Sequence, residues 1–204
     1  MKINYQLELD KLIAGLDNTP KVLLHACCAP CSSYVLEYLS KHFVIDLFYY
    51  NPNTYPKEEY EKRGRELEKL VSLMEFPNPV GMIPTVYEPE KFYKTAFGME
   101  KEREGGLRCK SCFRLRLEET AKQAKILGYD YFATTLTVSP HKNAQLINQI
   151  GLELEKEYGI KYLISDFKKR EGYKRSIELS RQYDIYRQEY CGCEYSLLAN
   201  TQII

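Results

Sequence analysis

The chain has 204 residues, of which 44% are hydrophobic, a formal net charge of +1 and seven cysteines. This length and apolar content suit one domain with a full-sized core, and the near-zero charge excludes a polyanion-binding surface that covers the whole molecule. The charged N-terminal segment has no signal-like apolar core, and no apolar run is long enough to span a membrane. We therefore expect a cytoplasmic protein whose cysteines stay reduced and serve as metal ligands or catalytic thiols rather than in disulfides.

Strand and helix patterns alternate along the chain. Apolar or β-branched runs predict strands at residues 21–25, 43–50, 80–83, 131–138 and 162–165. Apolar spacing and turn signals predict helices at residues 32–41, 56–74, 88–93, 112–127, from 139 onward and at 173–190. This alternation predicts an α/β fold, a single domain with a mostly parallel sheet flanked by helices and with functional sites at the carboxyl ends of the strands. We divide that domain into an N-terminal segment (1–20), an α/β core (21–190) and a C-terminal tail (191–204).

Three cysteines follow the first predicted strand directly. The sequence VLLHACCAPCSS places Cys27, Cys28 and Cys31 between this strand and a helical segment. A strand, a thiol-rich turn and a helix together favour a soft metal. Because consecutive residues of an extended chain point in opposite directions, we expect Cys27 and Cys28 to face different ligand sets, with two metal centres side by side.

Four further cysteines form two close pairs. Cys109 and Cys112 form a CxxC at the start of a helix, which presents both sulfurs to one side and favours thiolates. Cys191 and Cys193 flank Gly192, whose conformational freedom allows a tight turn that brings two sulfurs to one metal. Four thiolates suffice for a zinc site or a [4Fe–4S] cluster, and the residue types alone leave both open.

Four other side chains are weaker candidates for a functional site. His141 follows Pro140 at a helix start and suits a metal ligand, a proton donor or a plain cap-region residue. Asp166 ends the last strand and suits a metal ligand or a turn residue. His25 is more typical of a core histidine with satisfied hydrogen bonds, and Asp46 of a residue that is salt-bridged or at the polar end of the sheet.

Basic and aromatic residues interleave near the C-terminus. The candidate RNA-binding residues there are Lys168, Lys169, Lys174, Arg175, Arg181 and Arg187. Arginine and lysine position phosphates, and tyrosines such as Tyr183, Tyr186 and Tyr190 can stack on unpaired bases. The tyrosines also fit the spacing of a helical core stripe, so the pattern supports either RNA binding or an ordinary solvated helix face.

Five segments of the chain together resemble one family, the epoxyqueuosine reductases of the QueH type. They are HACCAPCSSYV, FYYNPNTYPKEEY, RCKSCFRLRLEET, TTLTVSPHKN and DFKKREGYKRSIELSRQYDIYRQEYCGCEYS. The CCxxC, the CxxC and the terminal CxC stand in the family's order, with no departure at any of the seven cysteines. The matching segments run from the first strand to the C-terminus and leave out the first twenty residues.

The resemblance implies a fold, a reaction and two metal centres. The fold would be related to the adenine-nucleotide-binding HUP group, and the reaction would be the last step of queuosine synthesis in tRNA, in which an epoxide is reduced to an alkene and water. Family members resemble one another in holding a [4Fe–4S] cluster beside a single iron. Carried onto this chain, the metal ligands would be Cys27, Cys28, Cys31, Cys109, Cys112, Cys191 and Cys193.

The resemblance also suggests roles for individual residues and partners. We place Cys109, Cys112 and Cys191 on the cluster. The remaining thiols would be shared between the cluster and the single iron, and a carboxylate such as Asp166 would complete the iron site. His141 or a tyrosine would supply protons. The tRNA would present its unpaired anticodon-loop base, with the basic helix on its stem phosphates. An external electron donor of the ferredoxin or flavodoxin type would complete the reaction.

Three alternative functions use the same residues. Cys28-Ala29-Pro30-Cys31 looks like a thioredoxin-type CxPC, which would make the protein a dithiol oxidoreductase. A zinc-stabilised RNA-binding module would use the cysteines structurally. An ATP-using tRNA sulfur-transfer enzyme on the same fold would need a Gly-rich phosphate loop after the first strand, where this chain has its cysteine turn.

Overall fold

Five parallel strands form one sheet in the computed structural model, which describes residues 3–201 and side chains up to residue 199. The strand order is β3-β2-β1-β4-β5. The strands are β1 (Lys21–His25), β2 (Val44–Phe48), β3 (Val80–Ile83), β4 (Tyr131–Thr134) and β5 (Lys161–Tyr162). Strand β1 pairs with β2 on one side and with β4 on the other, so successive strands are added first to one side of β1 and then to the other. In parallel sheets a crevice is expected at such a switch point, beyond the carboxyl end of the strand.

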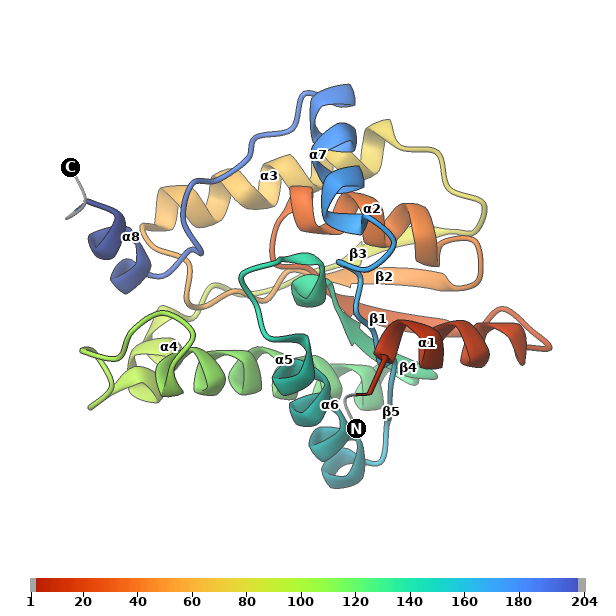
Figure 1. Cartoon of the computed structure of the whole chain (residues 1–204), viewed down its shortest axis with the longest axis horizontal. Coiled ribbons are helices and arrows are strands. Elements are labelled where there is room, and N and C mark those ends of the chain that lie inside the picture. Colours follow the sequence, from red (N-terminus) through yellow and green to blue (C-terminus); the bar gives the residue numbers. More distant parts are fainter. Residues whose placement is uncertain (1–2, 202–204) are drawn as a thin grey trace.

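Helices cover both faces of the sheet (Figure 1). One face carries α1 (Tyr5–Ala14), α2 (Ala29–Leu39), α3 (Lys57–Leu73) and α7 (Gly172–Gln182), and the other carries α5 (Leu107–Leu127) and α6 (Ala144–Tyr158). Short α4 (Pro89–Ala96) and α8 (Glu194–Thr201) lie at the end of α5 that contains the CxxC. The prediction of an α/β fold with a parallel sheet flanked by helices is confirmed.

Alternation along β1 divides the core into two halves. Val22 and Leu24 pack with α2 and α3, whereas Leu23 points to the opposite face and packs with α5 and α6. All three side chains are fully buried. The period of two in a strand therefore places apolar groups on both faces, as a sheet covered on both sides requires.

Several predicted boundaries shift because local caps decide them. The helix predicted from residue 32 begins at Ala29, because Pro30 suits a first helical turn and Cys28 takes the N-cap position. The strand predicted to reach residue 138 ends at Thr134, whose hydroxyl accepts from the Leu136 amide and caps a 3-10 turn (η1, Thr135–Val138). The following helix begins after Asn143, a side-chain N-cap, rather than at residue 139.

The C-terminal segment departs most from prediction. The helix predicted over 173–190 ends at Gln182, and Asp184 has a positive φ of 50°. Residues 183–193, called the tail segment below, then run without a helix along α3 to α8 (Figure 1). Helices α1 and α8 were not predicted. No helix in the described part of the chain is long and apolar enough to cross a membrane.

Candidate metal centre and its cavity

A cavity of about 600 Å³ opens at the carboxyl ends of the central strands. Its wall is formed by the turn after β1, the loop after β2, the loop between η1 and α6, α7 and the tail segment. Cys27, Cys31 and Cys191 line it together. The prediction of a cysteine-rich site at this edge of the sheet is therefore confirmed in its position.

Cys27, Cys28 and Cys31 form one compact group at the N-terminus of α2. Their three sulfurs lie within 4.8 Å of one another, and the sulfurs of Cys27 and Cys28 are 3.7 Å apart. The expectation that Cys27 and Cys28 face different ligand sets is wrong. The chain leaves the strand after His25 and Cys28 caps the next helix, so the strand alternation on which the expectation rested no longer applies.

Hydrogen bonds within this group shift the pKa values of the three thiols in opposite directions. Hydrogen bonds from Cys28 and Cys31 hold the pKa of the Cys27 thiol well below its usual range. The same hydrogen bond with Cys27 raises the pKa of Cys28 to about 12, and the pKa of Cys31 is raised for the same reason. The Thr135 hydroxyl donates to the Cys27 sulfur at 3.4 Å, so the protein itself supplies partners for a thiolate at this position.

The other four cysteines gather beside this group from α5 and the tail. Cys109 and Cys112 lie in the first turns of α5, and the Gly105 amide donates to the Cys109 sulfur at 3.2 Å. Cys112 and Cys193 share a small buried cluster with Phe92. Burial, followed by weaker effects that include the neighbouring tail cysteines, raises the pKa of Cys112 to about 12. Among residues 3–201, only the group of Cys27 brings three ligand atoms within 4.8 Å.

Cations face the cysteines from two sides. Arg116 of α5 is buried, and its guanidinium donates to the Asn51 side chain at 3.4 Å. Lys142 stands in the loop before α6 and lines the cavity. Burial alone would lower the pKa of both groups, but neighbouring cysteines, chiefly Cys112 for Arg116 and Cys191 for Lys142, outweigh it and raise both values. Lys142 acts to lower the pKa of Cys27, and Arg116 acts to lower the pKa of Cys112 against the larger effect of burial.

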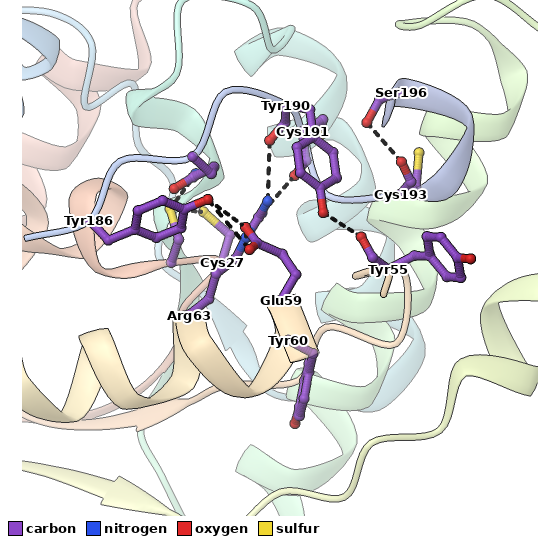
Figure 2. A network of polar contacts seen from close by, with 12 residues as sticks. Cys27, Tyr55, Glu59, Tyr60, Arg63, Tyr186, Tyr190, Cys191, Cys193 and Ser196 are labelled. Carbon is purple, nitrogen blue, oxygen red and sulfur yellow. Dashed lines mark hydrogen bonds and ion pairs between the residues drawn. The ribbon is translucent and has the colours of Figure 1, made fainter. Parts of the chain in front are cut away.

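The tail segment is fastened to α3 beside the cavity, as Figure 2 shows. Arg63 of α3 is buried, pairs with Glu59 at 2.8 Å and donates to the carbonyls of Cys191 (3.2 Å) and Tyr190 (3.4 Å). Two residues before Tyr190, the Gln188 amide donates to the Cys28 sulfur at 3.0 Å. These contacts deliver Cys191 to the cavity wall.

The predicted site residues are not all brought together. His141 is exposed and lines the cavity. Asp166 is buried with its carboxylate 2.9 Å from the Lys168 ammonium, and the cavity wall that the described residues form does not include it. His25 is the core histidine that the sequence suggested, because its two ring nitrogens meet the Thr134 hydroxyl (3.0 Å) and the Tyr50 carbonyl (3.1 Å). Burial lowers the pKa of His25 to about 3.

The basic residues of the C-terminal region have different surroundings. Arg187 lines the cavity beside Tyr173. Arg175 binds Glu37 of α2 through two nitrogens, at 2.6 and 3.0 Å, and also pairs with Glu178. The remaining candidates Lys169, Lys174 and Arg181 are exposed.

Sequence reasoning did not single out two cations of the cavity, Arg63 and Lys142. Arg63 belongs to none of the segments that resemble the family, whereas Lys142 directly follows His141 within one of them. Arg116 is one of the basic residues around the CxxC, and Asn51 and Asn53 were expected near the crevice because they follow the second strand. Asn51 and Asn53 follow β2, and the Asn51 amide donates to the Ala26 carbonyl at 2.8 Å, which supports the cysteine turn.

Comparison with known proteins identifies the family. The family model described as epoxyqueuosine reductase QueH matches residues 22–199. The chain belongs to the QueH family of epoxyqueuosine reductases. Members of this family are enzymes, so the QueH chain is an oxidoreductase by family.

Individual QueH relatives match most of the chain. Proteins named epoxyqueuosine reductase QueH from Staphylococcus epidermidis and Streptococcus pyogenes are 48% and 45% identical to it, covering 97% and 96% of this chain and 86% and 78% of those proteins. The protein of that name from Thermotoga maritima is 38% identical over 87% of this chain and 90% of its own length. Among solved structures, the U34-tRNA thiolase NcsA from Methanococcus maripaludis with its [4Fe-4S] cluster aligns with a TM-score of 0.49 and 11% identity, over 94% of this chain and 67% of that one.

Proposed function

We propose that the protein reduces the epoxide of epoxyqueuosine in tRNA to the alkene of queuosine. The observation that carries this proposal is the family match over residues 22–199, which includes all seven cysteines. The reaction consumes two electrons and two protons and releases the epoxide oxygen as water. Family membership disfavours the dithiol oxidoreductase and the zinc-stabilised RNA-binding module.

The donor set suits iron in two forms. A single tetrahedral ion with metal–sulfur bonds of about 2.3 Å spaces its sulfur ligands about 3.8 Å apart. The 3.7 Å between the sulfurs of Cys27 and Cys28 supports one iron ion at this group. Cys109 and Cys112, with thiols of the tail, would then hold a [4Fe–4S] cluster. Asp166 is left out of this proposal, because Lys168 is its partner.

The metal centres would supply electrons and a Lewis acid for the epoxide oxygen. The chain's own residues then have three tasks. Lys142 and Arg116 bring positive charge to a cavity that gathers thiolates and a departing oxygen. Tyr173 and Tyr190 line the cavity and offer rings on which the modified base can stack. His141, exposed in the same wall, is positioned to pass protons from solvent.

The tRNA would approach along α7. Arg187 in the cavity wall and the exposed Lys169, Lys174 and Arg181 would meet phosphates, whereas Arg175 is engaged with Glu37. An external donor of the ferredoxin or flavodoxin type would supply the electrons.

One experiment tests the function directly. The chain is reconstituted with iron and sulfide without oxygen, its iron, sulfide and zinc are counted, and the nucleosides of epoxyqueuosine tRNA are measured after incubation with a reductant. We expect about four sulfides with more than about four irons per chain, and conversion to queuosine. Replacing Cys28 by Ser should lower the iron content and abolish conversion. One zinc and no sulfide, with no conversion, would contradict the proposal.

A further inference from the structure

A charged stripe on α3 holds the tail segment. Its members recur at helical spacing and are Glu59, Lys62, Arg63, Glu66 and Lys69. The apolar face of the same helix, with Leu67 and Leu70, packs into the core. Arg63 is at helical spacing with Leu67 and Leu70 and is buried with them, whereas Lys62 is exposed. The stripe therefore runs from the buried face of α3 toward the solvent, and the tail segment lies over it.

Each position of the stripe contacts a tail residue. The Tyr186 amide donates to Glu66 at 2.9 Å, and the Tyr186 hydroxyl donates to Glu59 at 3.2 Å. The Lys62 ammonium lies 3.4 Å from the centre of the Tyr186 ring. Lys69 donates to the carbonyl of Asp184. From residue 184 onward the tail is thus fastened by hydrogen bonds and cation–π contacts.

Arg63, in the middle of the stripe, reaches the part of the tail segment that carries Cys191 (Figure 2). It is only 2% exposed, although an unpaired charge is costly to bury. Glu59 satisfies one edge of its guanidinium, and the carbonyls of Tyr190 and Cys191 satisfy the other nitrogens. If the tail moved away, these donors would lose both carbonyl partners.

The residue between the tail cysteines fits the same arrangement. Gly192 has a φ of +134°, and a Cβ there would lie 3.0 Å from a terminal nitrogen of Arg63 and 3.4 Å from the Asn53 amide. The Gly192 carbonyl also accepts from the Tyr55 amide at 2.8 Å. Glycine is needed here because the tail backbone approaches Arg63 closely, in addition to any turn it provides for the two sulfurs.

We propose that Arg63 is a positioning residue, which clamps the backbone of Tyr190 and Cys191 so that the tail cysteines stand at the cavity. Lysine cannot replace it fully, because a single ammonium cannot serve a carboxylate and two carbonyls with the fixed fork of a guanidinium. The clamp rests on the proposed function only in taking the tail cysteines as metal ligands.

The test compares full-length variants of two neighbouring arginines. Arg63→Gln removes the clamp, the double variant Glu59→Gln/Arg63→Gln avoids an unpaired buried carboxylate, and Arg65→Gln changes an exposed arginine of the same helix. Hydrogen exchange is measured across the chain. Alkylation rates of single cysteines are measured by mass spectrometry in the metal-free protein, and iron is counted after reconstitution.

We expect Arg63→Gln and the double variant to speed exchange of residues 184–193 and alkylation of Cys191 by at least about tenfold, as the loss of charge-assisted hydrogen bonds implies. The exchange of β1 and α6 should stay at the wild-type level, iron content should fall, and Arg63→Lys should restore part of it. Arg65→Gln should match the wild type. Unchanged tail exchange in both variants, or equal acceleration of β1 and α6 in the double variant, would overturn the clamp. If the tail loosens but the wild type binds no iron, the clamp stands and the proposed function fails.

Discussion

The side chains around the cavity are of three kinds: cysteines that offer sulfur ligands, cations that bring positive charge, and residues that hold the backbone in place. Lys142 belongs to the second kind, since it lines the cavity and its pKa is raised by neighbouring cysteines against the effect of burial. Its ammonium is suited to stabilise the negative charge that develops on the epoxide oxygen. This role differs from that of Arg63, whose donors are already used on the tail.

Replacement of Lys142 tests its role in turnover. We expect Lys142→Met to lower kcat by about 100-fold to 1000-fold, which is typical for the loss of one group that stabilises a developing oxyanion. Iron content and tRNA affinity should stay close to wild type, and Lys142→Arg should recover part of the rate. Single-turnover kinetics and filter binding provide the measurements, with Lys125→Met on the exposed end of α5 as the control. A loss of iron with the rate would instead make Lys142 a counter-ion needed for metal binding.

Individual helices are constrained by how closely they approach their neighbours. Gly151 of α6 lies against the Tyr162 ring of β5, where an added Cβ would come within 2.3 Å of a ring carbon. Gly64 of α3 also lies within a helix, but a Cβ there would meet Tyr49 at an ordinary 3.4 Å. Alanine substitutions at these two glycines therefore distinguish the effect of helix propensity from the effect of packing.

Alanine at the two positions should change stability in opposite directions. Gly64→Ala should stabilise the fold by up to about 1 kcal/mol through helix propensity. Gly151→Ala should destabilise it, because the overpacking cost of about 1–3 kcal/mol exceeds that gain. The free energies of unfolding in urea measure both effects. Equal stabilisation by the two variants would show that Tyr162 moves aside without cost.

Helix α7 and the turn before it carry the proposed tRNA contacts, with Lys169 in that turn and Lys174 in the helix. We expect the double variant Lys169→Glu/Lys174→Glu to weaken tRNA binding and to reduce the slope of log affinity against log salt by about 1–2. Iron content should not change. Arg175 is excluded from the variant, because its reversal would break the contact with Glu37 of α2. Lys125→Glu serves as the charge-matched control, and equal weakening by this control would remove α7 as the tRNA surface.

At the scale of the whole molecule, the fold brings cysteines from three distant segments to one region. The turn after β1, the start of α5 and the tail segment each supply cysteines. A metal centre whose ligands come from different segments, such as the proposed cluster held by α5 and the tail segment, binds the folded chain alone and therefore stabilises it by linkage.

Metal loading should accordingly raise the melting temperature. Binding at 1000 times the dissociation constant adds about 4 kcal/mol, which corresponds to roughly 8–16 °C for a chain of this size. Calorimetry of reconstituted and metal-free protein under anaerobic conditions measures the shift. The variant Cys112→Ser, which removes a proposed ligand of the cluster between α5 and the tail segment, should lose most of it. An equal melting temperature with and without metal would mean that the site does not couple these segments.

Local patterns in the sequence determined much of this protein. The buried run 22–24, the apolar spacing of Leu67 and Leu70 and the glycine stop at Gly128 lie within one element each, so propensity and periodicity suffice to place them. The cysteine motifs and their resemblance to the QueH family also depend on order along the chain alone. Both the α/β class and the family are therefore confirmed.

Tertiary structure alone decided how the cysteines and their partners meet. Tyr183, Tyr186 and Tyr190 have helical spacing, but Tyr186 contacts α3 and the predicted helix ends at Gln182. The turn after β1 aims Cys27 and Cys28 at one point, and Arg63 acts on a carbonyl 128 positions further along the chain. Contacts between residues so far apart leave no periodic trace in the sequence, because they depend on how the helices pack across the sheet rather than on any local preference.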